Sequence, residues 1–471
     1  VLVPGWNGPP DTQGRRKVKL ASRGAVKSII YYNENRGLRP EKMDLKESAV
    51  NFLGETLCPG FRETASAFGA GPSDPLGRFN DILAHARTNL PGLYRGCAPL
   101  ASLAGVPGVP ALERAALAAG LNKISGNRAL ARLKSGGTGR SGRVETALAP
   151  AAVLKRYAAL LAVLRATGWK MGDRTAAFHP VEYSYFGNFA SEVKNGNVGG
   201  LFFEFFQQYV LYRLLHNRRN IYYGGGIFRS KHEGARLLAA AVNADPVLII
   251  TRPDALLAAL KALDGNPAPF KRLKAVLTVG TVLSPAVRSL AEKLLGARVL
   301  DMYASTELGY VALSCGAPGG LRHVNEADYL AETDPGGELI VTDFNNRLMP
   351  MIRYRTGDAG ELLKCACGCG KSSVMLRVHG RAGSFLQAGD GRKLYEADII
   401  DLACAIDAPF FQAERASDGG VLLRVSGPDP AEAAALAEKA ALALGAGRGR
   451  VRCLPGSAFK ISSSGKFCFL P

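Results

Sequence analysis

Residues 298–307 read RVLDMYASTE, a short apolar run that leads directly into a polar sequence. The residues before it alternate between apolar runs and helical patterns. A helical pattern over 284–295 separates this run from another apolar run at 275–279. A third apolar run, 247–250, is followed by a helical pattern over 253–263. Short apolar runs between helices are typical of strands buried on both faces of a sheet. The sequence therefore predicts an α/β fold.

The regions on either side of this part have a different character. Residues 76–130 carry apolar side chains at helical spacing. Later in the chain, apolar runs at 337–342, 351–355 and 360–363 predict strands. We therefore expect helices before the sheet and a small β region after it.

A chain of 471 residues is long enough for more than one domain. We expect a mixed, basic and partly helical N-terminal extension over residues 1–75, and a large domain over 76–381. Residues 382–471 would form a small C-terminal domain. This last part holds a strand pattern at 421–425 and a helical pattern at 430–444.

The charge of the chain favours an anionic partner. The 59 Lys and Arg residues exceed the 40 Asp and Glu residues, which gives a net charge of +19. Nucleotides, coenzyme A, acidic carrier proteins and nucleic acids all fit such a charge. The compact basic run at 15–19 is too short to indicate DNA binding. A basic nucleic-acid-binding protein is therefore the weaker alternative, and an ordinary charged surface is a third reading.

Cysteine use and hydropathy predict a protein of the reducing cytoplasm. Nine cysteines in 471 residues do not make the dense framework of small disulfide-rich proteins. Residues 1–10 lack the pattern of a signal peptide. Charges or glycines interrupt the apolar stretches well short of about 20 residues, so we expect no membrane span.

A glycine-rich segment, residues 134–143 (KSGGTGRSGR), has the composition of a phosphate-binding loop. Glycines let backbone N–H groups approach an anion, and Ser, Thr and Arg side chains add further donors. The segment lacks the Walker spacing, and a flexible surface loop has a similar composition. The candidate phosphate contacts are Ser135, Gly136, Gly137, Thr138, Gly139 and Arg143.

Two further motifs place functional groups beside apolar strands. In residues 303–307 (YASTE), the tyrosine ring could stack on adenine, Thr306 could contact a phosphate, and Glu307 could hold Mg²⁺. In residues 354–358 (YRTGD), Asp358 could accept hydrogen bonds from both ribose hydroxyls. Each motif alone is also compatible with an ordinary strand end or β-turn.

Gly380-Arg381 and a C-terminal Ser464-Gly465-Lys466 complete an ordered set of five motifs. With them the chain resembles the adenylate-forming superfamily over about residues 80–471. That superfamily includes acyl-CoA synthetases, peptide-synthetase adenylation domains and luciferases. Residues 89–95 (NLPGLYR) and 350–358 (PMIRYRTGD), with the cysteines that follow, resemble the phenylacetate–CoA ligase group. The resemblance implies a large N-terminal domain of α/β sheets with a small β-barrel, and a small, mobile α+β C-terminal lid.

The resemblance also implies ATP-dependent activation of an aryl or other small organic acid. The carboxylate would attack the α-phosphorus, pyrophosphate would leave, and the acyl group would pass to coenzyme A or a carrier thiol. Lys466 would reach both reactants, while Thr306 and Glu307 would serve the phosphates and Mg²⁺. The other implied ATP or AMP contacts are Ser135, Gly136, Gly137, Thr138, Gly139, Arg143, Gly280, Tyr303, Ala304, Ser305, Asp358 and Arg381.

A cluster of cysteines adds a candidate metal site. By resemblance to the phenylacetate–CoA ligase group, Cys315, His323, Cys367 and Cys369 would form a structural Cys₃His zinc site. Cys365 could replace either neighbouring cysteine, so the ligand register stays open. Free buried thiols are the alternative.

The sequence gives less information about the acid pocket and about the group that accepts the acyl chain. His179, Tyr183 and Phe186 lie where the family places substrate-facing residues, although aromatic clusters are more often plain core. Arg143 stands where the family has lysine, and residues 382–384 replace the expected aspartate hinge. An amine or hydroxyl acceptor and a coenzyme F420 adenylyltransferase-like role therefore stay open. So does the oligomeric state, a homodimer included.

Overall fold

The computed structural model covers the chain from the N-terminal strands to the C-terminal tail. The residues it describes are 15–19, 29–33, 41–58, 61–66, 68, 74–120, 129–134, 144–178, 201, 220–224, 231–316, 320–388, 391–405, 411–416, 420–425, 430–443, 451–455, 459 and 469–470.

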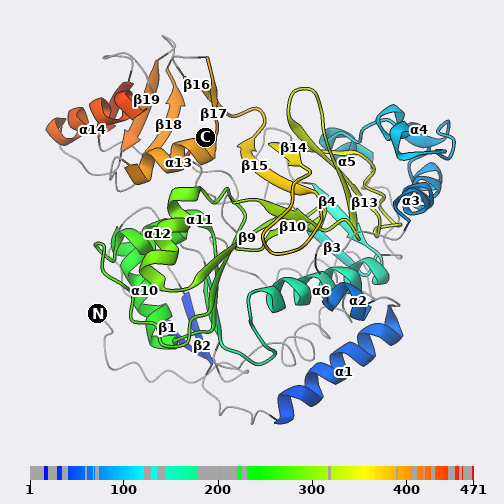
Figure 1. Cartoon of the computed structure of the whole chain (residues 1–471), viewed down its shortest axis with the longest axis horizontal. Helices are drawn as coiled ribbons and strands as arrows, with labels where there is room; N and C mark the ends of the chain where they lie inside the picture. Colours follow the sequence, from blue (N-terminus) through cyan, green and yellow to red (C-terminus); the bar gives the residue numbers. More distant parts are fainter. Residues whose placement is uncertain are drawn as a thin grey trace.

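A 13-stranded sheet runs through the large part of the protein (Figure 1). Its strands β5 to β9 are parallel to their neighbours, and the sheet turns antiparallel from β9 to β10. In sheet order the strands are β1 (Arg15–Lys19), β2 (Ile29–Asn33), β6 (Ile221–Gly224), β5 (Thr175–Phe178), β7 (Leu248–Thr251), β8 (Ala275–Val279), β9 (Arg298–Ser305), β10 (Gly309–Ser314), β11 (Arg322–Val324), β15 (Met375–Arg381), β14 (Tyr354–Leu363), β13 (Glu338–Asp343) and β12 (Tyr329–Thr333).

Helices cover both faces of the parallel part, which confirms the predicted α/β fold (Figure 1). Alternate residues of β8 show this directly, because Val276 joins one hydrophobic core whereas Ala275 and Leu277 join the other. A strand buried on both faces needs apolar side chains at successive positions, and this need explains the apolar runs. One face carries α10 (Lys231–Ala244), α11 (Pro253–Lys261) and α12 (Pro285–Leu295), and the other carries α1 (Glu41–Leu57), α2 (Phe61–Ser66) and α6 (Pro150–Ala166).

The helix α12 illustrates how local sequence sets the boundaries. Ser284 caps its first turn by accepting a hydrogen bond from the backbone N–H of Val287 at 3.3 Å. Pro285 occupies the first helical position, where no intrahelical N–H is needed. Gly296 ends the helix in the left-handed conformation, with a φ of 63°.

The predicted β region is present as the antiparallel strands β10 to β15 of the same sheet, with one correction. Residues 351–355 do not form one strand, because β14 begins only at Tyr354. Arg353 has a φ of 48°, which breaks the extended backbone. Its backbone N–H bonds to Thr342 Oγ1 at 2.9 Å, and its guanidinium reaches the carbonyl of Val109 at 2.6 Å. These contacts hold a turn where the apolar pattern predicts a strand.

Short helices precede this region, and a hairpin crosses beside it. The region predicted to be helical over 76–130 contains three α-helices and one 3₁₀ helix among its described residues. The hairpin strands pair antiparallel, with Lys134 opposite Glu145. The bounds are α3 (Pro75–Asn89), α4 (Pro91–Tyr94), η1 (Leu103–Gly108), α5 (Arg114–Gly120), β3 (Ala131–Lys134) and β4 (Glu145–Leu148).

The C-terminal residues form separate small sheets beside the helices α11 and α12 (Figure 1). Asp401 joins the two parts, because its Oδ1 accepts a hydrogen bond from the backbone N–H of Ala286 at 3.0 Å. The division of domains at residues 381 and 382 stays a prediction. The elements are β16 (Leu386–Gln387), β17 (Lys393–Leu394), α13 (Glu396–Ala405), β18 (Phe411–Arg415), β19 (Val421–Val425), α14 (Pro430–Ala443) and β20 (Val451–Pro455).

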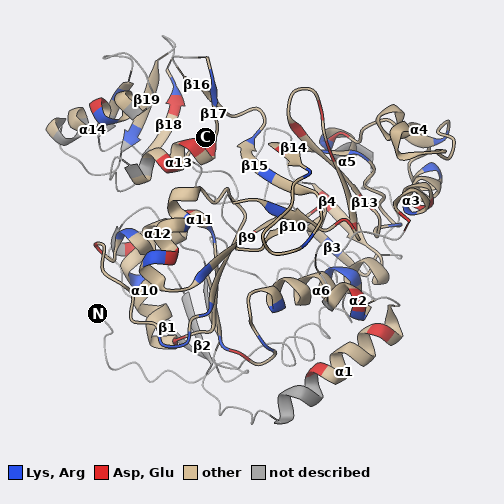
Figure 2. Cartoon of the chain, viewed as in Figure 1, with Lys and Arg blue, Asp and Glu red and all other residues tan. Residues whose placement is uncertain are grey.

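The charged residues are distributed over the molecule. Figure 2 shows Lys and Arg on many helices and strands of the described chain, interspersed with Asp and Glu. This pattern is typical of an ordinary charged surface rather than of a nucleic-acid-binding stripe. None of the described helices combines the length and the hydrophobicity needed to cross a membrane.

Candidate active site

Several predicted site residues lie at the carboxyl ends of parallel strands. The strands β8 and β9 pair in register, with Val279 opposite Met302. Gly280 and Tyr303 therefore follow at the same edge, where open α/β sheets bind ligands. Gly280 has a φ of 97°, and a Cβ at this position would lie 3.7 Å from Arg252 Cγ. That contact is an ordinary one, so the positive φ is what favours glycine at this position.

Tyr303, Asp358 and Arg381 meet although they are far apart in the sequence. The phenol of Tyr303 donates a hydrogen bond to Asp358 Oδ2 at 2.7 Å. Asp358 lies opposite Arg381 in the β14–β15 pairing, and its Oδ1 is 3.1 Å from Arg381 Nη1. A Cβ on Gly357 would lie 3.3 Å from the same guanidinium nitrogen, so the glycine leaves space for it. The three side chains form one polar group.

The electrostatics keep this group in defined charge states. Burial, and then the negative charge of Asp358, raise the pKa of the Tyr303 phenol well above its ordinary value. The phenol therefore stays neutral and remains a donor. The carboxylate of Asp358 accepts hydrogen bonds and carries a charge that Arg381 balances. A carboxylate held in this way can accept bonds from vicinal hydroxyls.

Glu307 is held in place by an arginine that the sequence did not reveal. Only 4 % of Glu307 is exposed. Its Oε1 accepts from Arg114 Nη1 at 2.9 Å, and the same nitrogen lies 3.4 Å from the Tyr354 hydroxyl. An ionised carboxylate in a buried position needs such a partner. Carboxylate oxygen is also the ligand type that Mg²⁺ prefers, so the chemistry of Glu307 fits that ion.

A second arginine donates hydrogen bonds to the backbone of the same loop. Arg156, from α6, donates to the carbonyl of Thr306 at 2.9 Å and to the carbonyl of Glu307 at 2.6 Å. A Cβ on Gly309 would lie 3.1 Å from Arg156 Nε, so a glycine permits this approach. Sequence analysis missed Arg114 and Arg156 because neither belongs to a motif and each lies in an ordinary helix. Only the fold brings them to residues about 150 or more positions away.

Other predicted residues lie outside the described part of the chain. The hairpin strands β3 and β4 are described up to Lys134 and from Glu145 onward, but the glycine-rich segment between them is not. The predicted site residues that lie outside the described residues are Ser135, Gly136, Gly137, Thr138, Gly139, Arg143, His179, Tyr183, Phe186 and Lys466. Ala304 and Ser305 end β9, where Ser305 Oγ accepts from the backbone N–H of Leu308 at 3.1 Å.

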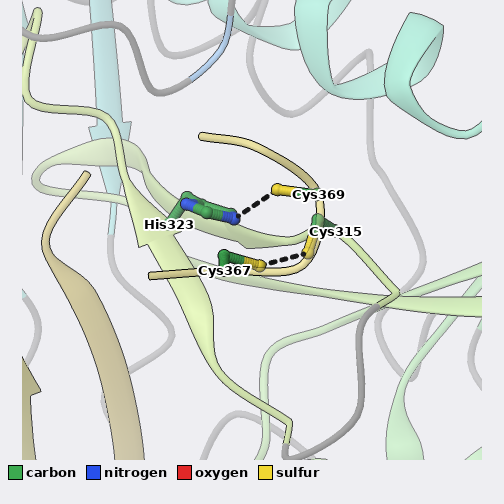
Figure 3. Close-up of side chains that lie close together, drawn as sticks. All are labelled: Cys315, His323, Cys367 and Cys369. Atoms are coloured by element: carbon green, nitrogen blue, oxygen red, sulfur yellow. Dashed lines mark hydrogen bonds between the residues drawn. The ribbon is translucent and has the colours of Figure 1, made fainter. Parts of the chain in front are cut away.

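Three cysteines and one histidine converge at a second place (Figure 3). The ligand atoms of Cys315, His323, Cys367 and Cys369 all lie within 4.8 Å of one another. Cys315 Sγ is 3.4 Å from Cys367 Sγ, and Cys369 Sγ is 3.2 Å from His323 Nε2. Ligands of a tetrahedral zinc ion lie about 3.8 Å apart. Cys365 is exposed and does not belong to this group.

The surroundings of the cluster favour metal-binding protonation states. Burial and the positive charge of Lys371 lower the pKa of His323, which keeps the imidazole neutral. His323 Nδ1 contacts Ser373 Oγ at 2.7 Å, so the ring is oriented with Nε2 toward Cys369. Burial opposes ionisation of Cys369, but hydrogen bonds from the Lys371 backbone and from Cys367 and Cys315 give it a lowered pKa. The donor set and its charges fit zinc.

Comparisons with known proteins address the fold. No protein-family model and no curated protein sequence match the chain. Solved structures of a 2-hydroxyisobutyryl-CoA ligase do match. In the postadenylation state with 2-HIB-AMP, the TM-score is 0.62 at 18% identity, covering 83% of this chain and 88% of that chain. With R3-HIB-AMP the TM-score is 0.59 at 18% identity, covering 84% and 89%.

The same ligase in its thioesterification state, with 2-HIB-AMP and CoA, gives a TM-score of 0.51 at 18% identity over 83% of this chain and 87% of that chain. The resemblance to the phenylacetate–CoA ligase group within this superfamily stays a prediction. What these matches show is that the chain has the fold of an adenylate-forming CoA ligase.

Proposed function

We propose that the protein is an ATP-dependent ligase that joins a carboxylic acid to AMP and releases pyrophosphate. One observation carries the proposal. Tyr303, Asp358 and Arg381 form a hydrogen-bonded group at the strand edge from which Glu307 also projects, in a chain with the fold of an adenylate-forming ligase.

In the proposed mechanism the chain supplies positions and charges. Asp358 accepts hydrogen bonds from the ribose hydroxyls, with Tyr303 beside the adenosine and Arg381 on the ribose or phosphate side. Thr306 and the glycine-rich loop, with Ser135, Thr138 and Arg143, bind the phosphates. Mg²⁺, when bound by Glu307 and the phosphates, neutralises charge between two anionic reactants.

Lys466 is the proposed residue that contacts the carboxylate and the α-phosphate. Phe469 lies three positions beyond it, and its backbone N–H donates to Glu396 Oε1 at 3.0 Å. Glu396 in turn packs against the end of β15, because a Cβ on Gly380 would lie 3.3 Å from Glu396 Cβ. The hydrogen bond of Phe469 to Glu396 therefore supports an approach of the tail toward Arg381, as a lid over residues 382–471 requires.

We further propose that the acyl group passes to coenzyme A or a carrier thiol, since the matched ligase was solved with CoA. The acid is proposed to be an aryl or other small organic acid, for which His179, Tyr183 and Phe186 would line the pocket. Structural zinc, bound by Cys315, His323, Cys367 and Cys369, would join β10, β11 and the loop before β15. A phenylacetate–CoA ligase-like specificity is one form of this proposal.

The test is ATP–pyrophosphate exchange with a panel of acids. The panel holds phenylacetate, substituted benzoates, 2-hydroxyisobutyrate, short acyl acids and amino acids. We expect exchange with at least one acid and none without acid. Adding coenzyme A should then convert the exchanging acid to a thioester. Exchange without thioester would favour another acceptor, and no exchange with any acid would count against the proposed function.

The replacement Asp358→Asn should weaken ATP binding about 10- to 100-fold, because a hydrogen bond to a charged group contributes about 1.5–3 kcal/mol. Isothermal titration calorimetry of ATP checks this without knowledge of the acid. Asp334→Asn, whose carboxylate instead pairs with Arg355 at the turn before β13, is the control. Equal ATP affinity in the Asp358 variant and the wild type would remove Asp358 from the nucleotide site.

A further inference from the structure

Glu396 occupies a junction of three parts of the chain. It begins α13, and a Cβ on Gly380 would lie 3.3 Å from both its N and Cβ atoms, so the helix start touches the end of β15. Its Oε1 accepts a hydrogen bond from the backbone N–H of Phe469 in the C-terminal tail. The stacked rings of His379 and Tyr395, with centroids 5.7 Å apart, reinforce the contact between β15 and α13.

The tail is fixed on both sides of this bond. The carbonyl of Phe469 accepts from the backbone N–H of Ala413 at 2.8 Å, which attaches the tail to β18. The side chains of Phe469 and Leu470 are buried in the core that α11, α12 and α13 share. Because the backbone N–H of a buried residue needs an acceptor, the Glu396 carboxyl has a defined task here.

Charged residues from two other elements surround the carboxyl. Arg252 and Asp254, at the start of α11, form a buried ion pair with two 2.9 Å contacts and are 3 % and 5 % exposed. Arg381 ends β15. All three influence the charge on Glu396. One side chain therefore links the tail to the strand end that carries a proposed nucleotide contact and to the helix beside Gly280.

We propose that Glu396 is a positioning residue that ties the C-terminal tail, and with it Lys466, to the strand edge at Arg381. This inference rests on the proposed function for the role of Lys466, but the tie itself does not. Glu396 touches no reacting atom in this scheme. It acts through the backbone of Phe469, three positions beyond the lysine.

Two replacements distinguish the hydrogen-bond acceptor of Glu396 from its negative charge. Glu396→Ala removes the acceptor, whereas Glu396→Gln keeps an oxygen that can accept the same hydrogen bond. Hydrogen–deuterium exchange of the C-terminal peptide, followed near pH 6.5, measures the tie without any substrate. We expect Glu396→Ala to speed exchange about 5- to 100-fold and Glu396→Gln to match the wild type. The control is Glu438→Ala, at an exposed position of α14, with wild-type exchange expected.

Activity then tests the link to Lys466. In ATP–pyrophosphate exchange, Glu396→Ala should lower kcat about tenfold or more with KM for ATP within about twofold, and Glu396→Gln should restore kcat. A tail that exchanges as slowly in Glu396→Ala as in the wild type would overturn the tie. A loosened tail with unchanged kcat would overturn the positioning role. A wild type without acid-dependent ATP–pyrophosphate exchange would instead contradict the proposed function. The hydrogen–deuterium exchange of the C-terminal peptide would still show whether Glu396 holds the tail.

Discussion

Replacing Lys466 by alanine is expected to lower acid-dependent ATP–pyrophosphate exchange about 100- to 1000-fold. Adenylation brings a carboxylate to an α-phosphate, so two anions must approach each other. A lysine aimed at both lowers the energy of the charged transition state, and removal of one such group costs about this factor. ATP affinity should change little, because the ribose and base contacts at Asp358 and Tyr303 remain.

The control for this experiment is Lys439→Ala, at an exposed position on α14 in the same C-terminal part. Lys466→Arg should recover only a part of the rate, since a planar guanidinium does not reproduce the compact ammonium. A Lys466→Ala protein with nearly wild-type exchange would show that the tail lysine takes no part in adenylation.

Loss of one cysteine of the Cys₃His cluster is expected to abolish stoichiometric zinc and to destabilise the protein. The replacement is Cys369→Ser, and purified protein should fall from about one zinc per chain to nearly none. Loss of a structural metal belongs to the largest effects of single mutations, and we expect a Tm lower by on the order of 10 °C. Metal analysis by mass spectrometry and thermal unfolding measure the two effects.

The neighbouring cysteine supplies a matched control. Cys365 lies four positions before Cys369 on the same loop but is exposed and outside the cluster. Cys365→Ser should therefore keep zinc and the wild-type Tm. Zinc that is lost from Cys365→Ser but kept in Cys369→Ser would reverse the ligand assignment. A wild type that binds no zinc would contradict the zinc site and leave these three thiols and the imidazole without a metal.

The sequence predicted the strands whose burial on both faces appears as a local run of apolar residues. The runs 247–250, 275–279 and 298–303 correspond to β7, β8 and β9, because strands covered on both faces require successive apolar residues. The run 351–355 failed as a strand because Arg353 makes a turn that depends on bonds to Thr342 and Val109. No local pattern encodes such long-range bonds.

The residues of the candidate site show the same difference, because some follow from local motifs and others only from the fold. Asp358 and Arg381 were predicted from the glycines beside them and from their order along the chain, and the structure brings the two side chains together, whereas their role in nucleotide binding stays a prediction. Arg114, Arg156 and Glu396 could not, since each acts on a partner between 73 and 193 positions away. The strand β1 was also missed, because a run as charged as RRKVK has no apolar alternation and pairs only at the edge of the sheet.

The most direct test of the central claim is the identity of the products formed from ATP. The protein is incubated with the acid panel and with ATP labelled at the α-phosphate in one set and at the γ-phosphate in the other. The account predicts AMP and pyrophosphate in equal amounts, formed only when a suitable acid is present. ADP and phosphate as products, or cleavage of ATP that does not depend on any acid, would contradict it.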